Sequence, residues 1–306
     1  MLKHKYALIK KLAIIIFVMP ILAQSKNIPT TSPYQQFAQL EQAAHGHLAI
    51  YAFNSANQQQ VNYRSNEPFP FCSTSKLMVI GAVLQQSLAK PELLNKIIHY
   101  TQQEVVASGY APITQQHQIQ GMTISQLAQA ALNYSDNLAM NLLIRQVGGI
   151  ESVNYFARSI GDQKFNLTRL EPELNTAIPH DLRDTTTAQA MGQSLFKLSL
   201  GMSLPIQYRQ LLQTWLKQNT TGKERIKAAL PANWLIGDKT GSGAYGTTND
   251  IAIIWSQQCP PLIISIYFTQ DKPDAPINNQ IIQEATGIIL KEFSRQNTCL
   301  AKALNS

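Results

Sequence analysis

The chain has 306 residues, of which 44% are hydrophobic, and it contains 15 glycines and 15 prolines. This length and composition are typical of a globular protein with a sizeable core in one or two domains, and they exclude a disordered or collagen-like chain. The formal net charge of +7 does not indicate nucleic-acid binding, because more than half of it comes from Lys3, Lys5, Lys10 and Lys11, and no basic cluster with interleaved aromatic residues follows.

The beginning of the chain predicts a secretory signal peptide over residues 1–23. Basic residues precede an apolar run from Leu12 to Ala23, and polar residues follow from Gln24. The run is too short to span a bilayer comfortably, although an uncleaved anchor is the alternative. We expect cleavage after Ala23, export to a bacterial periplasm, and no membrane attachment of the processed protein.

Strand patterns lie at both ends of the remaining chain. Residues 33–44 predict a first helix, and residues 280–293 predict a last helix with one apolar stripe. Alternating or continuous apolar runs predict five strands, at residues 47–53, 60–64, 234–240, 250–255 and 262–268. The economical arrangement is a single sheet built from both ends of the chain and covered by helices.

Helical patterns dominate the middle of the chain. The clearest helices are predicted at residues 124–132, 137–146, 150–160 and 187–198. We therefore expect an α/β sheet domain made of residues 24–68 and 217–306, with an all-helical domain, residues 69–216, inserted into it. A site is expected in the cleft between the two parts.

The segment from Phe71 to Met78 contains the first catalytic candidate. An apolar helical pattern follows Lys76, which places Ser73 at a predicted helix N-terminus and Lys76 three residues later on the same face. The helix dipole favours a developing anion at the Ser73 hydroxyl, and the Lys76 amine can take its proton. The alternative is that Ser73 or Ser75 only caps the helix, because capping serines are common.

Two later segments are candidate partners of Ser73. Ser135-Asp136-Asn137 follows an apolar helical run, where it can direct a hydroxyl and an amide into a cleft or simply cap the next helix. The Lys-Thr-Gly-Ser-Gly segment at residues 239–243 can bind a carboxylate and let a ligand approach the backbone closely. Its glycines begin a G-x-G-x-x-G match, but a strand pattern follows instead of a helix, so we exclude a dinucleotide site.

Residues 162–186 predict a long loop, because they lack periodicity and are rich in Pro, Asn and Asp. Loops of this length in compact proteins are usually functional. Glu171 can act as a general base on a water, with Asn175 as a second partner of that water. Arg169 and Asp184 can close the loop as an ion pair. The alternative is an exposed acidic loop without a catalytic role.

The four segments in this order closely resemble class A serine β-lactamases, most of all the cefotaximase-type branch. The resemblance covers essentially the whole chain after residue 23. It implies the β-lactamase/DD-peptidase-like fold, an α+β (α/β/α) sandwich with a five-stranded antiparallel sheet flanked by helices. It also implies hydrolysis of the β-lactam ring of penicillins and cephalosporins, hence antibiotic resistance, by a monomer without cofactor or metal.

The resemblance assigns roles to the residues of the pattern. Ser73 is the acylated nucleophile and Lys76 is a proton acceptor or relay. Ser135 gives a proton to the departing ring nitrogen. Glu171, with Asn175, activates the hydrolytic water within an omega loop at about residues 166–184. Whether Lys76 or Glu171 is the base for acylation stays open.

Further residues are expected to bind the substrate or to support the site. Asn137 holds the substrate amide, Lys239 and Thr240 bind its carboxylate, and Tyr110 lies at the cleft mouth. The backbone N–H groups of Ser73 and Ser242 form the oxyanion hole. The resemblance also implies a structural pairing of Arg169 with Asp184 and a cis Glu171–Pro172 bond.

Departures from the family pattern bear on the substrate range. An arginine that many members use for the carboxylate is replaced by Thr248 and by residues 277–279, and Lys272 is a candidate substitute. Ala244 stands where the cefotaximase-type branch has an acidic residue. Gly243 stands where carbapenemases have a cysteine that pairs with the one before the nucleophile, so we expect weak carbapenem turnover.

The chain has three cysteines, so at least one is unpaired. Cys72 reads as a small buried residue. Cys259 and Cys299 are expected at a strand turn and a helix end, both away from the cleft, and we hypothesise that they form a disulfide.

Three rival functions share part of the pattern. A D-Ala-D-Ala peptidase has the same nucleophile but needs no Glu171 loop, and a non-catalytic β-lactam sensor would be acylated once and stop. A generic esterase is disfavoured, because no G-x-S-x-G surrounds Ser73.

Overall fold

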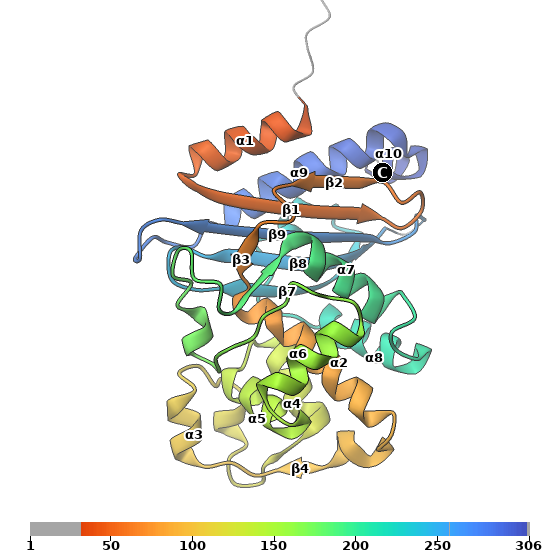
Figure 1. Ribbon diagram of the computed structural model, residues 1–306. Coiled ribbons are helices and arrows are strands. Elements are labelled where there is room, and N and C mark those ends of the chain that lie inside the picture. The colour runs from red at the N-terminus through yellow and green to blue at the C-terminus, as the bar shows by residue number, and fades with distance from the viewer. Residues whose placement is uncertain (1–31, 257, 305–306) are drawn as a thin grey trace, which may run out of the picture. The chain divides into compact units, whose positions relative to one another are not determined.

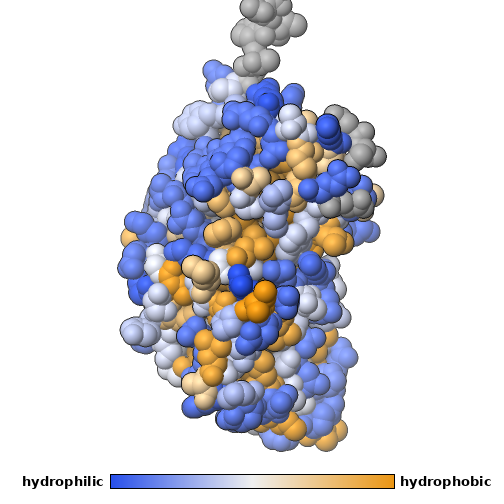
Figure 2. Space-filling view, turned by 90° about the vertical axis from the view of Figure 1, so that its right-hand side faces the viewer, coloured by the Kyte–Doolittle hydropathy of each residue, from blue (hydrophilic) through white to orange (hydrophobic). Residues whose placement is uncertain are grey.

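The computed structural model describes residues 32–256 and 258–304 (Figure 1). The predicted signal peptide, residues 1–23, lies outside the described residues. Among those described, no helix combines the length and the apolar character needed to cross a membrane. Figure 2 shows one face of the molecule, on which hydrophobic patches are interrupted by hydrophilic side chains.

A five-stranded antiparallel sheet forms the centre of the fold, which confirms the predicted fold class. The strand order is β2-β1-β9-β8-β7, so strands from the two ends of the chain meet where β1 pairs with β9. The strands are β1 (Gly46–Asn54), β2 (Gln60–Tyr63), β7 (Leu235–Ser242), β8 (Thr248–Trp255) and β9 (Leu262–Gln270). Each predicted strand is present, with its ends shifted by a few residues.

One face of the sheet is covered by the first and the last helices of the described chain (Figure 1). These are α1 (Pro33–Ala43), α9 (Asn279–Gln296) and α10 (Thr298–Leu304). The start of α1 is fixed by a capping box, in which Ser32 and Gln35 bond to each other's backbone N–H groups, and by Pro33 in the first turn. Phe37 and Phe293, on α1 and α9, are completely buried in this layer.

The opposite face is covered by α7, and further helices lie beyond it (Figure 1). They are α2 (Lys76–Ser87), α3 (Gln102–Ala107), α4 (Ile124–Asn133), α5 (Asn137–Val147), α6 (Ile150–Ser159), α7 (Ala188–Ser199) and α8 (Ile206–Lys217). Helix α2 is buried on every side from Lys76 to Leu84. A helix that is apolar all round is a core helix, so the N-terminus of α2, next to Ser73, is held rigidly.

Short elements complete the fold, and the sequence patterns did not predict them. Two-residue and three-residue strands form two ribbons, β3 (Pro68–Pro70) with β6 (Thr185–Thr187) and β4 (Ile97–Ile98) with β5 (Met122–Thr123). The 3₁₀ turns are η1 (Cys72–Ser75), η2 (Pro91–Asn95), η3 (Thr114–Gln116), η4 (Glu173–Asn175) and η5 (Ile226–Ala229). The β3–β6 ribbon matters for the site, because it joins the segment before Ser73 to the end of the long loop.

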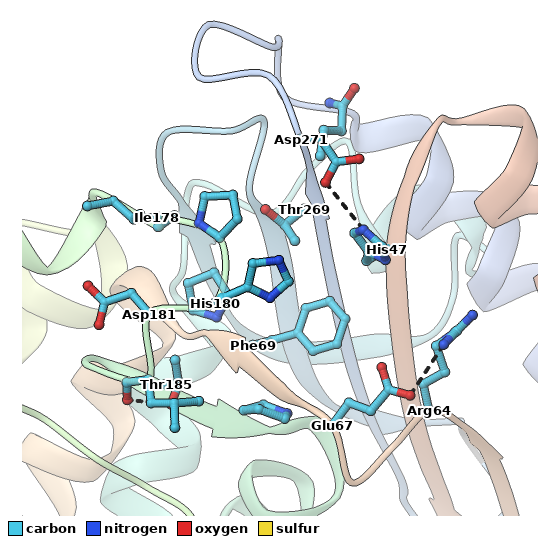
Figure 3. Close-up of a pocket in the computed structure, with 16 residues that line it drawn as sticks. His47, Arg64, Glu67, Phe69, Ile178, His180, Asp181, Thr185, Thr269 and Asp271 are labelled. Atoms are coloured by element: carbon cyan, nitrogen blue, oxygen red, sulfur yellow. Dashed lines mark hydrogen bonds and ion pairs between the residues drawn. The ribbon is translucent and has the colours of Figure 1, made fainter.

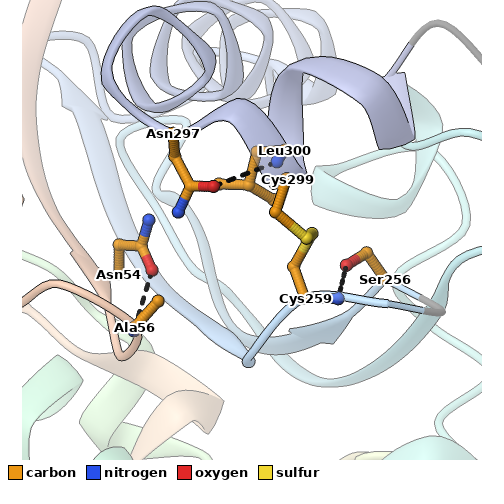
Figure 4. Close-up of a disulfide and its surroundings, with 7 residues drawn as sticks. All are labelled: Asn54, Ala56, Ser256, Cys259, Asn297, Cys299 and Leu300. Atoms are coloured by element: carbon orange, nitrogen blue, oxygen red, sulfur yellow. Dashed lines mark hydrogen bonds between the residues drawn. A yellow bond between two sulfur atoms is a disulfide. The ribbon is translucent and has the colours of Figure 1, made fainter.

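A disulfide joins Cys259 to Cys299, which confirms the predicted pairing (Figure 4). It links the turn between β8 and β9 to the first turn of α10. Around it, Ser256 accepts the N–H of Cys259 at 3.1 Å, and Asn297 accepts the N–H of Leu300 at 3.1 Å. Cys72 is the buried free cysteine.

Replacing Cys259 and Cys299 together by serine should lower the free energy of unfolding by about 2–4 kcal/mol, because the bridge closes a loop of 40 residues and restricts the unfolded chain. Denaturant titration measures this change. The disulfide itself is tested by thiol counting in unfolded protein, where the wild type should show one thiol without reductant and three with it. Three thiols without reductant would contradict it.

Candidate active site

The segment that carries Ser73 is a strained turn between β3 and α2. Cys72 has a φ of +48°, which is unfavourable for a residue with a side chain and is found mostly at functional sites. Ser73 lies in η1, directly before α2, and is buried. Its hydroxyl therefore points inward and does not cap the helix, so the capping alternative is not what the structure has.

Three charged or nucleophilic groups meet at this point. The Lys76 ammonium donates to Ser73 Oγ at 2.6 Å and lies 2.5 Å from Glu171 Oε1. Ser73 Oγ in turn donates to Glu171 Oε1 at 3.3 Å. Ser73 is thus bonded to a carboxylate, which can accept its proton directly, and to an ammonium, which can do so once it has passed a proton to Glu171.

Glu171 is held over Ser73 by the long loop and by α5. The residue is only 3% exposed, and its Oε2 accepts a hydrogen bond from Asn175 at 2.5 Å. Asn141 bonds both backbone polar groups of Glu171, accepting its N–H at 3.0 Å and donating to its carbonyl at 2.9 Å. The bond between Glu171 and Pro172 is cis, as predicted.

Asn141 is a functional residue that the sequence analysis missed. It lies one helical turn after Asn137 on α5, so both side chains project from the same face of that helix. Its spacing from Asn137 was the signal that could have found it.

The Ser135–Asn137 turn is organised by a buried aspartate. Asp136 accepts the N–H groups of Ile113 and Thr114 at 3.0 and 2.9 Å, and it caps α5. Ser135 has a φ of +60°, so it too is held in an unfavourable conformation. Asn137 accepts a hydrogen bond from the Lys76 ammonium at 3.0 Å, which brings this turn into the Ser73 cluster.

Strand β7 supplies the opposite wall. Lys239 is completely buried and donates to Ser135 Oγ at 3.2 Å. Burial, and then the nearby Lys76, lower the pKa of Lys239 to about 7. The hydroxyl of Thr240 lies 2.5 Å from that of Thr221. This part of the site therefore combines one ammonium with several hydroxyls, a combination that suits a carboxylate ligand.

Arg225, just before η5, is a second residue that the sequence analysis missed. It is buried behind β7, and its guanidinium donates to Ser242 Oγ at 2.7 Å and to the Gly241 carbonyl at 2.9 Å. Burial lowers its pKa, and Asp250 opposes this effect. Lys272, the expected substitute for the missing family arginine, is exposed after β9, whereas Arg225 reaches the strand. No local pattern distinguishes Arg225 from a surface arginine.

The long loop is closed by the predicted pairing of Arg169 with Asp184. Arg169 Nε lies 2.5 Å from Asp184 Oδ2. Asp184 is completely buried and also accepts the N–H groups of Thr168 and Arg169 at 2.7 and 2.9 Å. A buried carboxylate with this many donors fixes both ends of the loop that carries Glu171.

The loop and β7 also touch directly. The N–H of Ala244 donates to the Asn175 carbonyl at 3.0 Å. A Cβ added at Gly243 would lie 2.6 Å from that carbonyl and 2.7 Å from the Sγ of Cys72, so only glycine fits there without a shift. Burial raises the pKa of the Cys72 thiol, which leaves it protonated and unreactive.

Tyr110 lies at the surface, with 54% of the residue exposed. Its carbonyl accepts the N–H of Asn137 at 2.8 Å, so the exposed ring stands next to the Ser135–Asn137 turn. Its position can therefore limit the groups that enter beside Asn137.

A separate cavity of about 500 Å³ lies on another side of the long loop. Residues 177–182, β3 and the ends of β1 and β9 line it (Figure 3). Its charged residues are paired locally, His47 with Asp271 and Arg64 with Glu67. None of the predicted site residues lines it, so it is not the site of the Ser73 chemistry. Within the described parts of the chain, no cluster of three His, Cys, Asp or Glu residues could hold a metal ion.

The arrangement around Ser73 suits acyl transfer. It combines a nucleophile, an adjacent carboxylate that can accept its proton, an ammonium that can relay a proton, a second hydroxyl at Ser135 and a cationic group at Lys239. The carboxylate of Glu171, with Asn175, lies where it can direct a water to the acylated serine.

Comparison with known proteins gives the family. Residues 32–293 match the Beta-lactamase enzyme family. The β-lactamase OXY-2 of Klebsiella oxytoca is 46% identical over 92% of this chain and 97% of its own length. The β-lactamase Toho-1 of Escherichia coli is 46% identical over 90% of this chain and 94% of its own.

Solved structures agree. A β-lactamase from Desulfarculus baarsii superposes with a TM-score of 0.83 at 44% identity, over 85% of this chain and 97% of the other. A β-lactamase from Burkholderia phymatum gives 0.82 at 42% identity, with the same coverage. The chain belongs to the β-lactamase enzyme family, as a class A member of the branch that contains the CTX-M-type enzymes.

Proposed function

We propose that this protein hydrolyses the β-lactam ring of penicillins and cephalosporins through an acyl-serine intermediate, and that it thereby confers resistance to these antibiotics. The observation that carries the proposal is the buried cluster in which Ser73 Oγ lies 2.6 Å from the Lys76 ammonium and 3.3 Å from the Glu171 carboxylate. The relatives named as β-lactamases support it, because each covers about nine-tenths of the chain.

In acylation, Ser73 Oγ attacks the lactam carbonyl carbon and gives up its proton. Glu171 contacts the hydroxyl and can accept the proton directly, and Lys76 can accept it after passing one of its own to Glu171. The backbone N–H groups of Ser73 and Ser242 stabilise the oxyanion. As the C–N bond of the ring breaks, Ser135 gives a proton to the departing nitrogen, and the charge of Lys239 beside Ser135 favours this transfer. The proton taken from Ser73 then replaces the one that Ser135 has lost, so that Glu171 is again a carboxylate.

In deacylation, Glu171 takes a proton from a water that attacks the ester carbonyl. The bond between the acyl carbon and Ser73 Oγ then breaks, and Glu171 gives the proton to Ser73 Oγ, which it contacts at 3.3 Å. Asn175 supports this step in two ways. It donates to Glu171 Oε2 at 2.5 Å, and its own Oδ1 atom is buried without a partner among the described residues. A buried acceptor of this kind suits a water hydrogen.

Substrate binding follows the charges of the cleft. The carboxylate that penicillins and cephalosporins carry would lie at Lys239, Thr240 and Ser242, and Arg225 orients the hydroxyl of Ser242. Asn137 binds the amide side chain, and Tyr110 borders the entrance. We further propose that the enzyme has an extended spectrum that includes oxyimino cephalosporins, and that it turns over carbapenems only weakly.

We also propose how the chain is processed and how its domains are organised. Residues 1–23 act as a signal peptide and the mature protein works as a monomer in the periplasm, without attachment to a membrane or nucleic acid. Residues 69–216 form the inserted helical domain, and residues 24–68 and 217–306 form the sheet domain.

Glu171→Ala should stop turnover after one acylation, because no other carboxylate among residues 32–256 and 258–304 contacts Ser73. Mass spectrometry after mixing with a chromogenic cephalosporin should show the acyl adduct accumulating, while steady-state hydrolysis falls by at least about a hundredfold. Glu173→Ala, two residues away and exposed, is the control and should hydrolyse normally. Unchanged turnover in Glu171→Ala would refute the proposed deacylation.

Asp184→Asn should loosen the loop, because it removes the charge of a buried ion pair. We expect a loss of about 3 kcal/mol in the free energy of unfolding and a larger fall in deacylation than in acylation. Asp181→Asn breaks the exposed pair with Arg183 in the same loop and should change little. Equal effects of the two substitutions on deacylation would show that the buried pair does not hold Glu171.

The pH dependence of hydrolysis should reflect the protonation of Lys239. Because its pKa is lowered to about 7, the free enzyme loses this positive charge as pH rises through neutrality. We expect kcat/KM, which follows the free enzyme, to decline above about pH 7, and Lys239→Arg to move this decline to higher pH because arginine stays charged. A kcat/KM that stays constant to pH 9 would contradict the role of the Lys239 charge.

A further inference from the structure

We propose that Asn249, on β8, and Tyr267, on β9, are positioning residues for acyl transfer. They hold the turn that carries Ser73 in a fixed place relative to Ser242, so that the two backbone N–H groups of the oxyanion hole keep their spacing. This inference rests on the proposed function, because it concerns how the acylation step is supported.

The Asn249 side chain bonds to the turn from behind. It is completely buried, and its amide donates to the carbonyls of Pro70 and Phe71 at 2.8 and 3.2 Å. Its own oxygen accepts the N–H of Phe268 at 3.3 Å. Asparagine is disfavoured in strands, so propensity does not account for it in a central strand, whereas these three hydrogen bonds do.

Tyr267 reaches the same carbonyl through Thr74. The Thr74 hydroxyl donates to the Phe71 carbonyl at 2.8 Å and lies 2.8 Å from the Tyr267 hydroxyl. Because the Thr74 proton is used on Phe71, Tyr267 is the donor in the second bond. Burial raises the pKa of Tyr267, which keeps that proton in place. Two strands of the sheet thus fix one carbonyl at the start of η1.

The same residue connects the turn to the other half of the oxyanion hole. Asn249 is the cross-strand partner of Gly241, which directly precedes Ser242. Arg225 donates to the carbonyls of Asn249 and Gly241 at 2.6 and 2.9 Å. Gly241 also packs on the turn, since a Cβ there would lie 2.7 Å from the Phe71 carbonyl. Asn249 therefore bonds to the turn through its side chain and to β7 through its backbone.

The turn needs such support because it is strained. Cys72, between Phe71 and Ser73, has a φ of +48°, and a residue in this region keeps its conformation only where its surroundings enforce it. When the bonds to the Phe71 carbonyl are lost, Cys72 can relax and carry the N–H of Ser73 with it. A displacement of about 1 Å at a reacting centre can cost a hundredfold in rate.

The experiment uses the full protein with Glu171→Ala, in which the acyl-enzyme should accumulate. Asn249→Leu removes all side-chain hydrogen bonds and keeps the branched shape and the number of side-chain heavy atoms, and Tyr267→Phe removes only the hydroxyl. The matched controls are Asn54→Leu, at a completely buried asparagine at the end of β1, and Tyr63→Phe, whose buried hydroxyl donates to Glu41 at 2.6 Å. Stopped-flow absorbance with a chromogenic cephalosporin measures acylation, and infrared spectroscopy measures the ester carbonyl stretch.

We expect Asn249→Leu to slow acylation by at least about tenfold and Tyr267→Phe to slow it by a smaller factor in the same direction. Both should shift the ester carbonyl stretch to higher wavenumber, because weaker hydrogen bonds polarise the carbonyl less. The controls should lose thermal stability without changing either reading. If Asn249→Leu does not fold, Tyr267→Phe decides the result.

Acylation rates and carbonyl frequencies equal to those of the controls would overturn the inference while leaving the proposed function intact. Absence of any acyl-enzyme when Asn249 and Tyr267 are both unchanged would overturn the proposed function, and this inference with it.

Discussion

The active site is built around one buried ion pair, between the Lys76 ammonium and the Glu171 carboxylate, which are 2.5 Å apart and have no exposed side-chain surface. Burying two charges costs several kcal/mol per ion, and their attraction offsets this only when further hydrogen bonds satisfy them. Here the Lys76 ammonium also donates hydrogen bonds to Ser73 and Asn137, and the Glu171 carboxylate accepts one from Asn175. The pair is therefore a demanding arrangement that the surrounding structure must enforce.

Lys76 and Glu171 lie 95 positions apart in the chain, so the loop that carries Glu171 must be held against the start of α2. Three contacts achieve this. Asp184 and Arg169 close the base of the loop, the β3–β6 ribbon ties its end to the segment before Ser73, and Asn141 holds the backbone of Glu171 from α5. Each contact is buried or nearly so, which explains how an irregular segment can place a carboxylate as accurately as a helix would.

The parts of this design that the sequence predicted are those with a local signature. Long strands and helices repeat their apolar residues, and Ser73 and Lys76 are three residues apart on one helical turn. Asn141 had such a signature in its spacing from Asn137. Arg225, Asn249 and Tyr267 could not be found in this way, because their partners are mostly backbone carbonyls or hydroxyls contributed by distant segments. The strands β3 and β6 were not predicted either, because a run of three residues is too short to show the alternation of apolar and polar residues that marks a strand.

The charges of the site also explain why it should receive an anion. Lys76 is neutralised by Glu171, whereas Lys239 has no carboxylate within ion-pair distance among the described residues. The nearby acidic residues compensate it only in part, because burial raises the pKa of Asp238, on β7 itself, to about 6 and raises that of Asp250, on β8, well above its usual value. With the guanidinium of Arg225 behind β7, this part of the site keeps a positive potential that a ligand carboxylate can satisfy. Burial lowers the pKa of Lys239 to about 7, and an anion placed beside this lysine would raise it again, so that the lysine would carry its full charge.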